Sequence, residues 1–202
     1  MRHADSLTKS ESRRICFILL HGVIVIGIII GAYLASVRGV ETTGRCWWLH
    51  QFIAPVFGKK TVLAVFRNTF LVSAAFCGAA FILGFFTFGQ PFALALLILR
   101  GMGIGASASV MYMAFGTKAI SAVMVLVLPK AAVLSFLTAL SVRESFKMSN
   151  FLLCSVTGKE HINDSDRKIA KLYLLKFAVI IAAAAIAAIP DSLITHWFIG
   201  AN

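Results

Sequence analysis

Acidic residues are almost absent from the middle of this chain, and their absence limits how its cations can be neutralised. No Asp or Glu lies between Glu41 and Glu144, so about half of the 202 residues contain no carboxylate side chain. Charged residues make up only 13% of the chain and hydrophobic residues 59%, whereas soluble domains carry roughly 25% charged residues. This composition excludes an ordinary soluble domain and indicates an integral membrane protein.

Motifs for metal binding and catalysis are also missing. The four cysteines form no CxxC pair and the five histidines form no HxxxH or HExxH pair, so no metal-ligand spacing is present. No Walker loop, GxSxG or GxGxxG element stands in a suitable context. His21 is far along the chain from Ser107 and Ser109, which argues against an intramembrane enzyme. The sequence therefore predicts no catalytic residue, no metal and no cofactor.

The chain is rich in positive charge, with a formal net charge of +11. A charge of this size on its own would suit nucleic acid. Enrichment of Lys and Arg at the cytoplasmic flanks of membrane helices explains it better, because no soluble module here is long enough to bind nucleic acid. Membrane lipid is therefore an expected partner and nucleic acid is not.

Five apolar runs are long enough to cross a bilayer as helices, which rise about 1.5 Å per residue. The first run is longer than the roughly 7–15-residue core of a signal peptide, so it is predicted to be an uncleaved span. The predicted fold class is all-α, with residues 1–14 as a cytoplasmic tail and 15–202 as a single membrane domain. Pro190 is expected to end the last span. The expected spans are about 15–37, 69–88, 91–115, 119–142 and 172–189.

Aromatic and basic residues outside these runs mark the expected membrane interfaces. Trp47 and Trp48 stand beside Arg45 in the mixed stretch 38–68, and Trp197 follows the last run. Such side chains suit the headgroup region, so the three tryptophans are predicted interfacial anchors. The stretch 38–68 is expected to form either a short interfacial helix or a re-entrant hairpin.

The distribution of Lys and Arg predicts the orientation of the chain. The N-terminal segment and the stretch 143–171, an expected loop, hold ten Lys and Arg, against six in the opposing loops. Cytoplasmic loops carry the excess of Lys and Arg. The N-terminus is therefore expected in the cytoplasm and the C-terminus outside.

Two lone cations, Arg100 and Lys130, lie inside the third and fourth expected spans. A charge at bilayer depth costs roughly 2.5–3.5 kcal/mol, so it usually has a partner or a function. Counting from the span centres places the two side chains within roughly 5 Å of each other in depth. Pro129 is expected to bend the fourth span beside Lys130. With Asn68, these residues form a candidate intramembrane polar site.

Three interpretations of the two cations stay open. Both side chains can extend along their stems toward the interface. They can instead line a polar cavity that accepts an anion, such as a lipid headgroup or a partner's carboxylate, or they can line a proton or ion path. Two groups of glycines, in the first and third expected spans, are predicted to let helices pack closely. They are Gly22, Gly27 and Gly31, and Gly101, Gly103 and Gly105.

The order of motifs from residue 65 to residue 150 resembles the stage II sporulation protein M family. Phe66-Arg67-Asn68 leads an apolar span, and a short Gly/Pro turn follows. The next span contains the basic-Gly-x-x-x-Gly element Arg100-Gly101-Met102-Gly103-Ile104-Gly105, and the one after it contains Pro129. Family members often follow this proline with a Gln-Asn or His-Gly pair and a second proline. Here Lys130-Ala131 and Leu134-Ser135 take these places.

The resemblance implies a non-enzymatic membrane component of sporulation. In the family, such a protein joins a bitopic membrane protein and a peptidoglycan-degrading hydrolase in a complex at the septum, where it acts in engulfment of the forespore. The expected function is therefore a scaffold of a septal peptidoglycan-remodelling complex in the cell membrane of a spore-forming bacterium. The alternative is a small transporter or channel for an anionic solute or lipid, with Arg100 and Lys130 lining its path.

Overall fold

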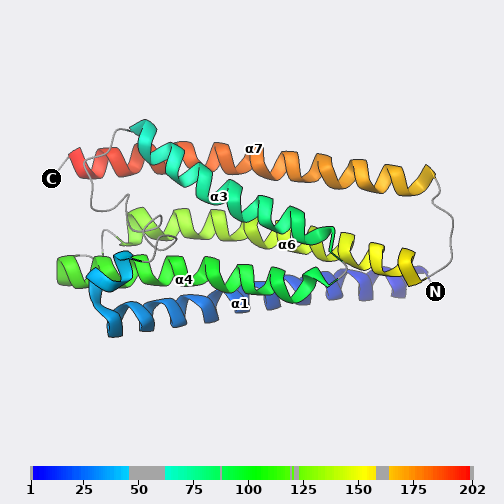
Figure 1. Cartoon of the computed structure of the whole chain (residues 1–202), viewed down its shortest axis with the longest axis horizontal. Helices are drawn as coiled ribbons and strands as arrows, with labels where there is room; N and C mark the ends of the chain where they lie inside the picture. The colour runs from blue at the N-terminus through cyan, green and yellow to red at the C-terminus, as the bar shows by residue number, and fades with distance from the viewer. Residues whose placement is uncertain are drawn as a thin grey trace.

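The computed structural model describes residues 2–45, 62–86, 88–118, 120, 123–157 and 164–200. Over these residues all regular secondary structure is helical, and consecutive long helices run in opposite directions along one axis (Figure 1). Two short elements, the 3-10 turn η1 (Gly116–Lys118) and the π-helix η2 (Val123–Val127), precede the fourth long helix. The five long helices are α1 (Arg2–Arg45), α3 (Val62–Gly84), α4 (Gly89–Phe115), α6 (Leu128–Thr157) and α7 (Asp164–Gly200).

Four of these helices are long and apolar enough to cross a membrane, so the predicted all-α membrane fold is confirmed. Their apolar stretches contain at most a few charged residues, and many of their large hydrophobic side chains are exposed on the outside of the bundle, as lipid contact requires. The stretches are Phe17–Val37, Val62–Gly84, Gly89–Met113 and Ala170–Pro190.

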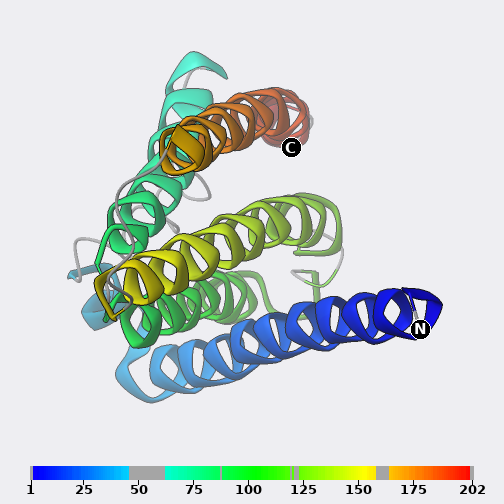
Figure 2. The ribbon, with the colours of Figure 1, turned by 90° about the vertical axis from the view of Figure 1, so that its right-hand side faces the viewer.

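The remaining long helix, α6, is the most central element of the bundle. It contacts α1, α3, α4 and α7, and Figure 2 shows it between α7 on one side and α1 and α4 on the other. Its sequence contains charged residues and a series of serines, so it is less apolar than α3, α4 and α7. A helix that meets protein on several sides can carry such residues, because other helices satisfy their hydrogen bonds.

Several helix boundaries differ from the sequence expectation. Helix α1 includes most of the expected tail, and α3 begins at Val62 rather than near residue 69. The expected loop at 143–171 is largely helical, because α6 continues to Thr157 and α7 starts at Asp164. The apolar stretch of α7 ends at Pro190, as expected, but the helix itself continues through this proline to Gly200.

The fourth expected span shows the largest difference. The run 119–142 was expected to be one helix bent at its centre by Pro129. In the structure this run is not one regular α-helix, because the π-helix η2 ends at Val127 and α6 begins at the next residue, Leu128. Pro129 therefore lies directly after a π-helical segment, where the regular α-helical hydrogen bonding is interrupted.

Candidate functional site

Arg100 lies inside the bundle, near the middle of α4. Only 3% of its surface is exposed, and its Cζ atom lies 5.3 Å from the centroid of the Phe76 ring on α3. A guanidinium at this distance over an aromatic face is attracted by the ring's negative face. The side chain thus stays at the level of Phe76 and links α4 to α3, instead of extending to either end of the bundle.

Lys130 makes its contact at a different level. Its Nζ donates a hydrogen bond of 2.9 Å to Oγ1 of the buried Thr69 on α3. Thr69 and Phe76 are two helical turns apart, or about 10 Å along α3. The two cations were expected within roughly 5 Å of each other in depth, and their contacts on α3 are farther apart than this.

The polar residues predicted to form one intramembrane site are therefore divided between two places. Asn68 is adjacent to Thr69 and half-buried, so it lies at the level of Lys130. Pro129 is exposed on the outside of the bundle. Arg100 stands apart from all three, beside Phe76.

The backbones of α1 and α4 touch where glycines lie on both helices. A Cβ atom added at Gly27 would come within 2.5 Å of the Ile98 carbonyl oxygen. One added at Gly31 would collide with the Met102 backbone, and one at Gly105 with the Ile28 carbonyl. Any larger residue at these positions would push the two helices apart.

The other predicted packing glycines have different environments. Gly101 belongs to the same contact, since an added Cβ would meet the Ile24 carbonyl, and Gly103 is buried. Gly22, in contrast, is exposed and has nothing within 4 Å of its added Cβ. Of the three predicted glycines on α1, only Gly27 and Gly31 therefore lie where α1 and α4 approach closely, and Gly22 does not.

A row of buried hydroxyl groups follows one side of α6, and the sequence interpretation missed it. Each member is at most 7% exposed. The spacing of three or four residues places them on one side of the helix, and this recurrence is the signal that could have revealed them. We call this row the hydroxyl seam; it consists of Ser135, Thr138, Ser141, Ser145 and Ser149.

Three members of the hydroxyl seam connect α6 to α3 or to the turn that follows it. Ser145 Oγ lies within hydrogen-bond distance of the Ala80 carbonyl and of the Ser141 carbonyl one turn earlier. Ser141 Oγ contacts Cys77 Sγ at 3.4 Å, and Ser149 donates a 2.9 Å hydrogen bond to the Phe86 carbonyl. Small hydroxyl residues allow close helix approach in a membrane while their hydrogen bonds are satisfied.

Aromatic residues hold α7 against the end of α3. Tyr173 donates a 3.0 Å hydrogen bond from its hydroxyl to the Phe81 carbonyl. Its ring belongs to a cluster with Phe81, Phe85 and Phe177, whose contacting ring centroids lie 4.8–5.7 Å apart. Gly84 leaves room for the Tyr173 hydroxyl, because an added Cβ would collide with it.

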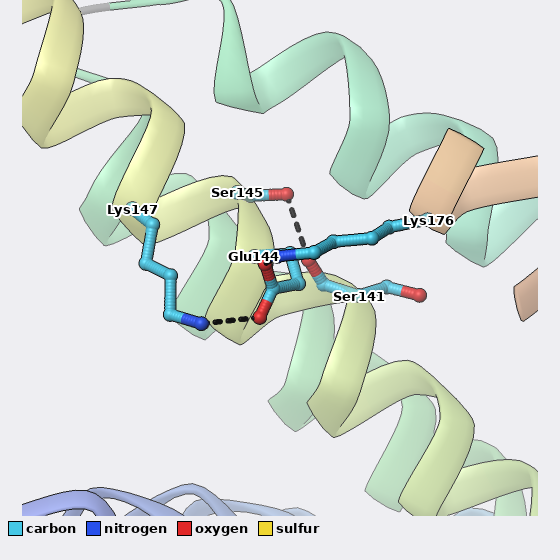
Figure 3. Close-up of polar contacts among 5 residues, drawn as sticks. All are labelled: Ser141, Glu144, Ser145, Lys147 and Lys176. Atoms are coloured by element: carbon cyan, nitrogen blue, oxygen red, sulfur yellow. Dashed lines mark hydrogen bonds and ion pairs between the residues drawn. The ribbon is translucent and has the colours of Figure 1, made fainter. Parts of the chain in front are cut away.

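Glu144 forms the centre of a charged cluster on α6 (Figure 3). Its Oε1 atom lies 2.5 Å from Lys147 Nζ, and its Oε2 atom lies 2.7 Å from Lys176 Nζ on α7. Burial alone would raise the pKa of Glu144, but hydrogen bonds and positive charge from the two lysines lower this pKa below its ordinary value. The carboxylate is therefore ionised at neutral pH and ties α7 to α6.

Aromatic contacts join α1 to the same part of α6. The Arg143 Cζ atom lies 5.4 Å from the centroid of the Phe17 ring. His21 stacks on Phe17, and its Nδ1 atom lies 2.9 Å from the Phe17 carbonyl oxygen. Both rings also contact Phe136 on α6. His21 thus has a local hydrogen-bond partner and an aromatic environment, which is a packing role.

The remaining predicted sites are only partly described. Trp47 and Trp48 lie outside the described residues, and Trp197 belongs to α7. Within the described part of the chain, no group of three or more His, Cys, Asp or Glu could hold a metal ion. No family model, no curated protein and no solved structure matches this chain.

Proposed function

We propose that this chain is a non-enzymatic membrane scaffold of a septal peptidoglycan-remodelling complex that acts in forespore engulfment. The proposal names as partners a bitopic membrane protein and a peptidoglycan hydrolase, at the sporulation septum of a spore-forming bacterium. The observation that carries it is the meeting of the three motifs of the resemblance. They lie on α3, α4 and α6, which pack against one another.

The contacts between these motifs involve their polar residues. Thr69, which follows Asn68 of the first motif, accepts a hydrogen bond from Lys130, which follows the proline of the third motif. Arg100, which begins the glycine element of the second motif, lies over Phe76 of α3. The three motifs are far apart in the sequence but contact one another in the bundle. This supports the interpretation that they serve the same structural role.

The placement of polar groups supports a scaffold over a catalyst. Ser145 of the hydroxyl seam, the Tyr173 hydroxyl and Lys130 all contact other helices of the same bundle. The outward faces of α1 and α7 are apolar and exposed, so they are available to lipid or to the membrane helices of partner proteins. A rigid bundle with apolar outer faces suits a protein that holds others in place.

Deletion of the gene in a spore-forming host tests this proposal. We expect sporulation to stop after polar septation while vegetative growth stays normal, and expression of the wild-type chain from a second locus to restore spores. Affinity purification from sporulating cells should recover a peptidoglycan hydrolase. Normal counts of heat-resistant spores in the deletion strain would contradict the proposal.

A second candidate function is transport of an anionic solute or lipid, and one observation favours it. Ser73 is buried on α3, between Thr69 and Cys77, and its Oγ atom makes no hydrogen bond among the described residues. A hydroxyl of this kind between the levels of Lys130 and Arg100 could contact an anion that moves past both cations. Chloride flux into liposomes that disappears in Arg100→Leu would favour this function over the scaffold.

A further inference from the structure

Three cations and one carboxylate lie where α6 faces α1 and α7. Lys147 of α6 and Lys176 of α7 contact Glu144, and Arg143 of α6 lies over Phe17 of α1. The Glu144 side chain is only 12% exposed, while Lys147 and Lys176 are 53% and 51% exposed. We call these four residues the basic cluster. Its net charge is positive, and the positive groups are the ones that face outward.

Glu144 holds the two lysines in place and leaves N–H groups on each of them available to a ligand. An ammonium group has three N–H donors, and each lysine uses one of them on the carboxylate. Because both nitrogens contact oxygens of a single carboxylate, they lie no more than about 7 Å apart. A phosphate group can accept hydrogen bonds from two ammonium groups at that spacing. Figure 3 shows Lys147 and Lys176 reaching Glu144 from opposite sides.

Arg143 adds a third cation at the same edge. It lies four residues before Lys147, so the two side chains share one face of α6. Its guanidinium lies over the Phe17 ring, which directs it toward α1. The positive groups thus extend from α7 across α6 to α1.

The basic cluster lies at the level where the apolar part of the bundle begins. Phe17 is the first residue of the apolar stretch of α1. Ser145, next to Glu144, packs against Gly84, the last residue of α3. Lys176 lies inside the apolar stretch of α7 and reaches the carboxylate with its long stem, as lysines near a membrane interface do. This is the depth of lipid phosphates.

Exposed apolar side chains continue from the basic cluster toward the middle of the bundle. Val133 and Phe136 are exposed on α6, and Val179 is exposed on α7. A soluble anion would use only the cations, whereas a phospholipid would cover both surfaces at once. The net positive charge favours an anionic headgroup over a zwitterionic one.

We propose that the basic cluster binds the headgroup phosphate of an anionic phospholipid, whose acyl chains lie against Phe136 and Val179. Lys147 and Lys176 donate to the phosphate oxygens, and Glu144 is a positioning residue that keeps the two ammonium groups together. Arg143 contributes charge from the side of α1. This site is independent of the scaffold function proposed above.

Titration of phosphatidylglycerol into the full-length protein in a neutral detergent tests the site, with bound lipid counted by native mass spectrometry. We expect the Lys147→Gln, Lys176→Gln double variant to bind about 25-fold more weakly, or about fivefold for each lysine. Arg67→Gln, which removes an exposed cation at the opposite end of the bundle, should bind like wild type. Phosphatidylcholine should bind weakly to all of these proteins.

Glu144→Gln separates a built site from general attraction between opposite charges. The substitution adds net positive charge but releases the lysines, so we expect weaker binding, whereas general attraction requires tighter binding. The Lys147→Arg, Lys176→Arg variant keeps both charges and should retain most of the affinity, which also controls for folding. Tighter binding by Glu144→Gln, an equal loss in Arg67→Gln, or full displacement by inorganic phosphate at the lipid's concentration would overturn the proposal.

Discussion

At the scale of single residues, Arg100 shows how a bundle can hold a charge at membrane depth. Removing a cation from water is costly, and Arg100 is only 3% exposed. The contact with the Phe76 ring supplies part of the stabilisation, since cation–π attraction is stronger where water is excluded. The arginine is thus expected to depend on this phenylalanine.

A double-mutant cycle between Arg100 and Phe76 measures that dependence. We expect the Arg100→Leu and Phe76→Leu variants to show a coupling free energy of about 1–2 kcal/mol. Reversible unfolding of the protein in mixed micelles provides the four free energies. The matched control is Phe70→Leu, at a ring that stacks on Phe66 and lies nearly two turns before Phe76 on α3. Its effect on the free energy of unfolding should be additive with that of Arg100→Leu. Additivity of Arg100→Leu with Phe76→Leu to within about 0.3 kcal/mol would contradict the interpretation.

At the scale of helices, two different solutions allow close packing in this bundle. Helices α1 and α4 approach through the missing side chains of Gly27, Gly31 and Gly105. Helices α3 and α6 approach through the hydroxyl seam, whose members donate to carbonyl groups on one helix or the other. Apolar area alone gives little preference for one neighbour in lipid, so these contacts are what select the partner of each helix.

Identical substitutions at two glycines of α1 should have opposite effects. Gly31→Ala places a Cβ against the Met102 backbone, so we expect a loss of about 1–3 kcal/mol in the free energy of unfolding. Gly22→Ala meets nothing and should raise this free energy by about 0.4–1 kcal/mol. Thermal unfolding of both purified variants in the same detergent gives the comparison. Equal effects at the two positions would show that α1 and α4 do not touch at Gly31.

Apolar run length predicted the existence of the helices but not their ends. The run from 91 to 115 matches α4 closely, because Gly89 and Gly116 bound it on both sides. Helices α1 and α7 extend well beyond their apolar runs into polar sequence, which hydropathy cannot mark as helical. The π-helix before α6 gave no signal in the sequence. The hydroxyl seam was missed because serine is neither clearly apolar nor charged.

At the scale of the whole molecule, the alternating helices divide the ends of the bundle into two groups. The start of α1, the end of α6 and the start of α7 lie at one end, and the end of α4, the start of α3 and the end of α7 lie at the other (Figure 1). The first end carries the larger number of Lys and Arg, including those of the basic cluster. Because cytoplasmic segments carry the excess of Lys and Arg, we expect this end of the bundle to lie inside the cell.

Cysteine labelling of intact cells tests this orientation. Asn150 is exposed on α6 beyond the basic cluster, and Thr117 is exposed in η1 at the opposite end. In a variant whose four native cysteines are replaced, we expect a membrane-impermeant maleimide to label Thr117→Cys in intact cells and Asn150→Cys only after the membrane is opened. Both positions should react equally in detergent, which controls for local access. Labelling of Asn150→Cys alone in intact cells would reverse the orientation and place the basic cluster in the outer leaflet.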